Sequence, residues 1–208
     1  MAYFLDLMPI LTEITLALEN LNEWSSPKYV SGDSLVNAYD SCKITPQPLG
    51  VCLIIGTWNY PIQLALIPLA SAIAAGNCAI VKPSEVAPKS AILLEFLLKK
   101  YLDTDSFAVV NGAVKETTVL LEQKFDHIFY TGNGSVGSII LKAASKNLTP
   151  VVLELGGKSP VYVDVDCDIK VIAKRIYWAK TINASQVFPN NLDLYRARLH
   201  SLSQGRSG

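Results

Sequence analysis

The chain has 208 residues, half of them apolar, and its 18 basic and 18 acidic side chains balance to a formal net charge of zero. Because domains usually hold about 100–200 residues, this length fits one large domain or one domain with fragments. The balanced charge argues against nucleic-acid binding, which depends on clustered Lys and Arg. The abundance of apolar residues excludes a disordered chain.

The cysteines and histidines provide no pattern for a metal site. The cysteines are widely spaced without a C-x-x-C pair, and the histidines number only two (Cys42, Cys52, Cys78, Cys167; His127, His200). Zinc sites need closely spaced Cys and His ligands, and free cysteines are typical of reducing compartments. We therefore expect no metal and a cytoplasmic location.

The longest apolar segments do not match a leader or a membrane span. Residues 1–18 contain Asp6 and Glu13 and lack the basic start and cleavage site of a signal peptide. Residues 58–81 are interrupted by Pro61, Pro68 and Gly76, whereas a membrane helix needs about 20 continuous apolar residues. We expect a soluble chain without a transmembrane segment.

The first predicted element is an amphipathic helix over residues 11–21. Its apolar residues recur three or four positions apart (Leu11, Ile14, Leu18, Leu21). Residues 30–47 are polar and rich in turn formers. They predict an irregular connection with at most one short strand.

From residue 51 onward, short apolar strands alternate with helices. The predicted strands are 51–55, 79–81, 107–110, 127–130 and 151–155, and helices are predicted at 61–76, at 88–102, at 116–124 and after 137. The helix predicted at 88–102 is expected to bury Leu93, Phe96, Leu97 and Leu98. This alternation predicts an α/β fold with a doubly wound, mostly parallel five-stranded Rossmann-like sheet. Its ligand site should lie at the carboxyl ends of the strands.

The pattern weakens after Asp164. Residues 169–179 predict one more helix. Three of the four arginines then fall in the last thirteen residues, beside several Ser, Asn and Gly residues. This tail is expected to be unstructured.

A glycine-containing segment follows the fourth predicted strand and begins a helix. It consists of Gly132, Asn133, Gly134, Ser135, Val136 and Gly137. Backbone N–H groups at such a helix start bind phosphate. A plain strand-to-helix turn explains the segment equally well, since the usual dinucleotide fingerprint follows the first strand of the fold.

Lys82 and Glu85 follow the second predicted strand. There the carboxylate could accept hydrogen bonds from a ribose, and the ammonium could reach a ribose or phosphate oxygen. A turn ended by Pro83, with Ser84 or Glu85 at a helix start, is the simpler alternative.

Asn59 lies in the segment that joins the first strand to its helix. Its amide can donate a hydrogen bond to an oxyanion or cap the helix. Glu154 interrupts the otherwise apolar fifth strand. If it is buried, its pKa is raised and it is a candidate general base; the alternative is a pair with Lys158 or a backbone donor.

Two other motifs are set aside. Tyr39 and Lys43 have the Tyr-x-x-x-Lys spacing of short-chain reductases but precede the first strand. Lys158 follows two glycines but lacks the upstream glycine of a phosphate-binding P-loop.

Taken together, the segments resemble the aldehyde dehydrogenase superfamily, and within it the class 3 or fatty aldehyde dehydrogenase branch. The resemblance covers about residues 11–186. Its motifs occur in the family's order: QPLGV at 47–51, TWNYP at 57–61, AAGN at 74–77, KPSE at 82–85, FDHI at 125–128, TG at 131–132 and LELGGKSP at 153–160.

The resemblance implies a role for each candidate residue. Asn59 would be the oxyanion-hole amide and Glu154 the general base that activates the deacylating water. The residues implied to contact NAD or NADP are Thr57, Trp58, Lys82, Glu85 and Gly132 to Gly137. The family reaction begins with a Cys thiolate that attacks a small-molecule aldehyde; hydride then passes to NAD(P)+, and water hydrolyses the thioester.

The chain departs from the family pattern in three ways. Phe188 stands where the nucleophilic Cys is expected, and Ser138 stands where relatives usually carry Lys. Family members are also more than twice as long. The resemblance therefore implies a C-terminally truncated chain that lacks most of the catalytic domain, the dimerisation arm of a homodimeric family and the C-terminal membrane anchor of some relatives.

The expected organisation has four parts. Residues 1–48 form an N-terminal helix and connection, 49–158 the NAD(P)-binding domain, 159–186 the start of a catalytic domain, and 187–208 an out-of-family tail. The expected function is an inactive aldehyde dehydrogenase family member. The alternatives are a non-catalytic dinucleotide-binding or dominant-negative subunit, and a chain that does not fold alone because an apolar face is exposed.

Overall fold

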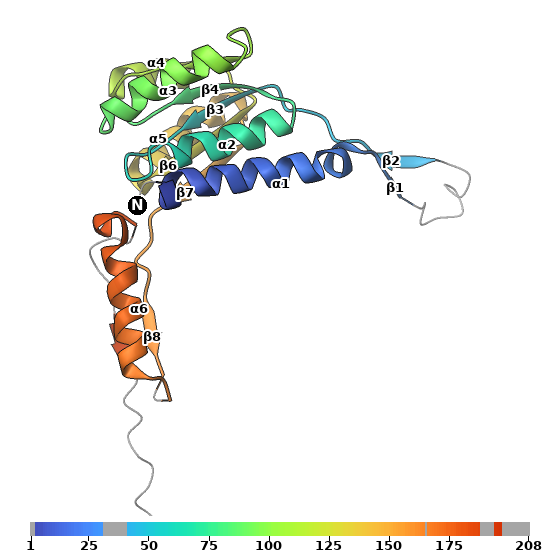
Figure 1. Cartoon of the computed structure of the whole chain (residues 1–208). Helices are drawn as coiled ribbons and strands as arrows, with labels where there is room; N and C mark the ends of the chain where they lie inside the picture. The colour runs from blue at the N-terminus through green and yellow to red at the C-terminus, as the bar shows by residue number, and fades with distance from the viewer. Residues whose placement is uncertain (1–2, 31–40, 165, 188–193, 197–208) are drawn as a thin grey trace, which may run out of the picture. The chain divides into compact units, whose positions relative to one another are not determined.

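The computed structural model of the chain describes residues 3–30, 41–164, 166–187 and 194–196. The chain forms two compact units, Met1–Leu155 and Gly156–Gly208. The first unit contains the central sheet and the helices that cover it, and the second contains α6 and β8 (Figure 1).

The central sheet has five strands in the order β5-β4-β3-β6-β7, and every neighbouring pair is parallel. The strands are β3 (Val51–Ile55), β4 (Cys78–Lys82), β5 (Phe107–Val109), β6 (His127–Gly132) and β7 (Val151–Leu155). The α/β, parallel, five-stranded prediction is confirmed. After β3 the chain adds β4 and then β5 on one side of it, and then returns to add β6 and β7 on the other side. The direction in which strands are added therefore reverses between β3 and β6. Ligands bind at such a switch point.

The central strand β3 is buried on both faces. Cys52 and Ile54 pack with α2 (Gln63–Ala74) and α3 (Pro88–Tyr101), whereas Leu53 and Ile55 pack with α4 (Val114–Glu122) and α5 (Gly134–Ala144). Successive side chains of a strand point to opposite faces. The continuous apolar run of β3 therefore supplies two cores, one under each pair of helices.

Helix α3 corrects one sequence expectation. Its buried residues are Ala91, Leu94 and Leu98, while Leu93 and Phe96 are 48% and 60% exposed. The buried positions are three and four residues apart, as the helical period requires. The sequence also carries apolar residues on the opposite face, so periodicity alone did not identify the face that packs on the sheet.

The segments that precede β3 are more regular than expected. The short π-helical segment η1 (Tyr3–Leu7) leads into α1 (Met8–Ser25), which lies alongside α2 (Figure 1). In its described part, the connection contains one full strand, β2 (Cys42–Ile44), which pairs antiparallel with β1 (Lys28–Val30) at its start. The motif residue Tyr39 lies outside the described residues.

The second unit contains β8 (Val161–Val163), α6 (Ile169–Thr181), the short 3₁₀ segment η4 (Ile182–Ser185) and β9 (Leu194–Arg196). Asp168 caps α6 by accepting hydrogen bonds from the backbone N–H groups of Lys170 and Val171. Strand β9 pairs parallel with β8. The expectation of an unstructured tail is therefore wrong for these three residues, because β8 offers them a backbone edge to pair with. Residues 188–193 and 197–208 lie outside the described part.

The helices of the described part are up to 18 residues long. Over the described ranges, none combines the length and the apolar character that crossing a membrane requires.

Candidate functional site: the carboxyl ends of the parallel strands

The turn between β6 and α5 is built by Asn133. Its side-chain Oδ1 accepts a hydrogen bond from the N–H of Val136 at 2.9 Å, so Asn133 is the N-cap of α5. Its backbone carbonyl accepts from the N–H of Gly137 at 3.0 Å and from the hydroxyl of Tyr130 at 3.2 Å. Burial raises the pKa of Tyr130, so the phenol keeps its proton for this bond. These bonds hold the turn in one conformation.

The three glycines of this segment have different environments. A Cβ at Gly132 would collide with the Tyr130 ring and hydroxyl, and a Cβ at Gly137 would lie 3.2 Å from Leu155 Cδ2 on β7. Those two glycines let the turn and the helix pack closely. A Cβ at Gly134 would meet no heavy atom within 4 Å, so the backbone there faces open space.

The first amides of α5 are available to a ligand. Among the described residues, no hydrogen bond engages the N–H groups of Gly134 and Ser135, whereas the next two amides donate to Asn133. Helix starts carry partial positive charge and bind anions, phosphate above all. The combination of open space at Gly134 and two unengaged amides fits the pyrophosphate of a dinucleotide.

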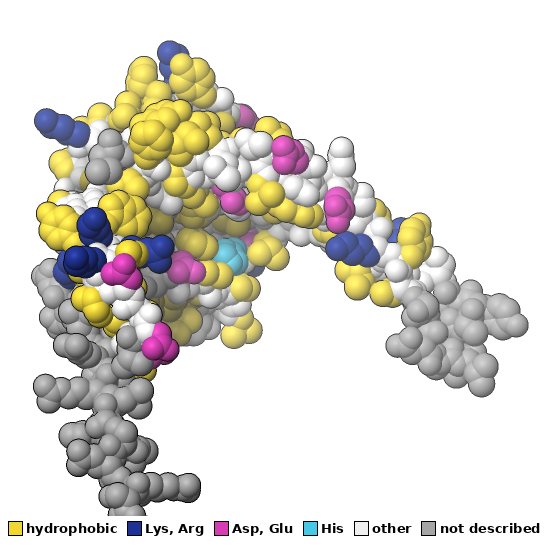
Figure 2. Space-filling model, turned by 60° about the horizontal axis from the view of Figure 1, so that its bottom comes forward, with side chains coloured by type: hydrophobic (Ala, Val, Ile, Leu, Met, Phe, Trp, Pro, Cys, Tyr) yellow, Lys and Arg dark blue, Asp and Glu magenta, His cyan; other side chains and the backbone are white. Residues whose placement is uncertain are grey.

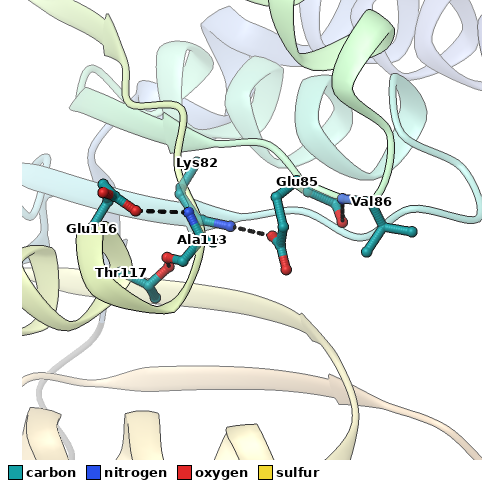
Figure 3. A network of polar contacts seen from close by, with 7 residues as sticks. Lys82, Glu85, Val86, Ala113, Glu116 and Thr117 are labelled. Carbon is teal, nitrogen blue, oxygen red and sulfur yellow. Dashed lines mark hydrogen bonds and ion pairs between the residues drawn. The ribbon is translucent and has the colours of Figure 1, made fainter.

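Lys82 and Glu85 form an ion pair at the end of β4, with 2.9 Å between Nζ and Oε2 (Figure 3). The lysine side chain is 5% exposed and the glutamate side chain 47% exposed. The hydrogen bond from Lys82 lowers the pKa of Glu85, so the carboxylate is ionised at neutral pH. The pair presents a fixed cation and an accessible hydrogen-bond acceptor at the carboxyl ends of the strands, as do the α5 amides.

Glu116, which the sequence interpretation missed, lies in the same network (Figure 3). Its Oε2 accepts a hydrogen bond from the N–H of Ala113 at 2.8 Å, at the start of α4. A Cβ at Gly112 would collide with the Glu116 side chain. Backbone N–H groups, with the nearby charges of Lys115 and Lys82, lower the pKa of Glu116. The signal in the sequence was a Glu in the first turn of the predicted helix, which is typical of a helix start.

Asn59 does not cap α2. That helix begins at Gln63 with Ile62 at the cap position, and the N–H of Gln63 donates to Asp6 instead. The hydroxyl of Thr57 donates to Asn59 Oδ1 at 2.7 Å. This bond orients the Asn59 amide with its Nδ2 donor end directed away from Thr57. The neighbouring Trp58 is exposed.

Glu154 corrects the expectation of a buried acid. The residue is exposed, and so are its strand neighbours Val152 and Leu155. Strand β7 is at the edge of the sheet, and α5 packs on the face that carries Leu153 and Leu155. Because side chains alternate, Glu154 lies on the other face. The burial from which a general base was predicted is therefore not found.

The topology gathers most of the predicted residues at the carboxyl ends of the parallel strands. Thr57 to Asn59 follow β3, Lys82 and Glu85 end β4, and the glycine segment ends β6, so they belong to three neighbouring strands. Glu154 pairs in register with Thr131 of β6 and so lies next to the glycine segment. Phe188, the residue in the expected nucleophile position, lies outside the described residues.

Comparisons with known proteins agree with this arrangement. The sequence profile of the Aldehyde dehydrogenase family matches residues 8–188, slightly more than the range of the resemblance seen in the sequence. The chain is 54% identical over 185 residues to aldehyde dehydrogenase family 3 member A2 of Macaca fascicularis, covering 89% of this chain and 38% of that protein.

A second relative is the dog (Canis lupus familiaris) protein named "Aldehyde dehydrogenase, dimeric NADP-preferring", 47% identical over 89% of this chain and 41% of that protein. Among solved structures, substrate-bound AldH of Staphylococcus aureus superposes with a TM-score of 0.90 at 40% identity, covering 95% of this chain and 43% of that one. The chain thus spans about two fifths of the length of these relatives. It belongs to the aldehyde dehydrogenase family.

Proposed function

We propose that the chain binds a nicotinamide dinucleotide, NAD or NADP, at the carboxyl ends of β3, β4 and β6. The observation that carries the proposal is the start of α5, where the N–H groups of Gly134 and Ser135 have no hydrogen-bond partner among the described residues and a Cβ at Gly134 would meet no heavy atom within 4 Å. A pyrophosphate there would receive two hydrogen bonds and the favourable end of the helix dipole.

The Lys82–Glu85 pair supplies the second contact. Glu85 is exposed and ionised, so it accepts hydrogen bonds from ribose hydroxyls, while the buried ammonium of Lys82 holds the carboxylate in place. When bound, the dinucleotide supplies a hydride acceptor.

Two further residues have roles in the family reaction. Asn59 is oriented by Thr57 as a donor to an oxyanion. Glu154 is exposed beside the glycine segment, where a carboxylate can accept a proton from water. Neither residue can replace a nucleophile, and Phe188 has no group that forms a thioester. We propose that this chain does not oxidise aldehydes.

The cysteines support a reducing, cytoplasmic location for the chain. All four are free thiols (Cys42, Cys52, Cys78, Cys167). Burial raises the pKa of Cys52, so this thiol stays protonated and behaves as a small apolar side chain. An unpaired set of cysteines is typical of proteins kept in a reducing environment.

One experiment with two readouts tests the proposed function. The purified 208-residue chain is titrated with NAD+ and with NADP+ in a calorimeter, and it is also incubated with each cofactor and a medium-chain aldehyde while reduced cofactor is measured by absorbance. We expect saturable binding of at least one cofactor and no reduced cofactor above the protein-free control. Absence of binding to both cofactors would contradict the cofactor role. Turnover would contradict the proposal that this chain, with Phe188 in the nucleophile position, does not oxidise aldehydes.

A further inference from the structure

The outer face of α3 carries an exposed stripe of apolar and basic side chains. Its members recur three or four positions apart along the helix and all point away from the buried Ala91–Leu94–Leu98 face (Lys89, Ile92, Leu93, Phe96, Lys99, Lys100). Ile92 is 66% exposed, and Tyr101 at the end of the helix is 70% exposed. We call these six residues and Tyr101 the α3 stripe. Figure 2 shows one face of the molecule, on which hydrophobic side chains are widely exposed.

Exposed apolar residues at this density need an explanation. Single exposed apolar side chains are normal, but a contiguous row on one helix marks an interaction site. Packing of α3 on the sheet is provided by its other face, through Leu94 and Leu98. The stripe also plays no part in the proposed cofactor site, whose residues end the strands of the sheet.

The basic residues indicate the kind of partner. Lys89 begins the stripe, and Lys99 and Lys100 end it. Lys99 is paired with Glu95 at 2.6 Å, but within the described ranges neither Lys89 nor Lys100 takes part in an ion pair. The ammonium of Lys100 lies 5.8 Å from the ring centre of Phe96 and 5.0 Å from that of Tyr101. The stripe is therefore apolar in the middle, with one lysine outside any ion pair of the described residues near each end (Lys89 and Lys100); the exposed Asp103 and Asp105 follow the helix.

This composition favours a lipid surface over a protein. Lysine is depleted at protein–protein interfaces, where Arg and Trp are enriched. Helices that lie in a membrane interface combine Lys on the margins with Phe, Leu and Ile that enter the acyl region, and their lysines extend toward the head groups. With 14 residues, α3 is about 21 Å long and is too short to cross the bilayer.

We propose that the α3 stripe is a docking site for an anionic membrane surface. The helix would lie parallel to the bilayer with Ile92, Leu93 and Phe96 inserted among the lipids. Lys89 and Lys100 would attract the acidic head groups, each adding about tenfold or less to the affinity. This proposal does not depend on dinucleotide binding, because the two surfaces share no residue.

Vesicle co-sedimentation tests the proposal with the full 208-residue chain. Vesicles of phosphatidylcholine alone are compared with vesicles that contain about one third phosphatidylserine, a strongly anionic surface. The test variants are Ile92→Ser with Phe96→Ser, which removes apolar area, and Lys89→Gln with Lys100→Gln, which removes charge. The matched controls are Val119→Ser and Lys124→Gln, two exposed residues outside the stripe. Far-UV circular dichroism and sedimentation without vesicles check each variant for folding and aggregation.

We expect wild type to bind the anionic vesicles at least about fivefold better than the neutral ones and to lose binding as salt is raised. Both stripe variants should bind at least about fivefold more weakly, since each loses one of the two contributions to interfacial affinity. The controls should match wild type. Equal binding by wild type and both stripe variants would overturn the proposal. Failure of wild type to bind the anionic vesicles would also overturn the proposal. If wild type then self-associates in sedimentation velocity and the Ile92/Phe96 variant does not, the stripe is a protein interface instead.

Discussion

Replacing Leu94 by alanine is expected to lower the free energy of unfolding by about 2–5 kcal/mol, the usual cost of a cavity left by a buried leucine. Leu94 is fully buried in the core formed by β3, β4, α2 and α3. Its neighbour Leu93 is about half exposed. Leu93→Ala should therefore change the unfolding free energy by less than about 1 kcal/mol, as surface substitutions do.

Urea denaturation followed by circular dichroism measures both variants. Because the two substitutions remove the same atoms from adjacent residues of one helix, helix propensity changes alike and the difference reports burial alone. Equal loss of stability in the two variants would contradict the difference in burial found in the structure. A larger loss for Leu93→Ala would show that α3 packs with the face predicted from the sequence pattern.

Replacing Lys82 by methionine is expected to weaken NAD+ binding by about 10- to 100-fold, which corresponds to one charge-assisted hydrogen bond of about 1.5–3 kcal/mol. Methionine fills nearly the same buried volume without the charge. Glu85 then loses its partner but stays hydrated, since half of its side chain is exposed. The fold should therefore persist while the carboxylate is no longer held toward the ribose.

Calorimetric titration with NAD+ checks this expectation. Lys142→Met is the matched control, because Lys142 is exposed in the last turn of α5, the end away from the glycine segment. The control should bind as wild type does. If Lys82→Met binds NAD+ with unchanged affinity while remaining folded, the Lys82–Glu85 pair is a structural ion pair and has no part in cofactor recognition.

The parallel sheet could be predicted from the sequence because each strand is a short apolar run bounded by Gly, Pro or Asn. Such runs do not depend on distant contacts for their interpretation. The packing face of α3 could not be predicted in the same way, because Leu93 and Phe96 form a second apolar row beside Leu94 and Leu98. Only the position of the sheet decides which row is buried.

The site was predicted in outline because parallel strands bring their carboxyl ends to one edge. Glu154 shows the limit of that reasoning. Its strand is apolar, but β7 is an edge strand and the face with Val152 and Glu154 remains exposed. Glu116 was missed for a different reason. A Glu in the first turn of a helix is common, and nothing local indicates that its carboxylate lies near Lys82.

Amide NMR during titration with NAD+ locates the bound cofactor on the chain. We expect the backbone amide signals of Gly134 and Ser135 to shift with NAD+ in a saturable way, followed by those around Lys82 and Glu85. The signals of Val161–Val163 and α6, which line a separate apolar cavity of about 260 Å³ in the second unit, should not move. Saturable shifts confined to that cavity, with Gly134 and Ser135 unchanged, would show that NAD+ does not bind at the start of α5.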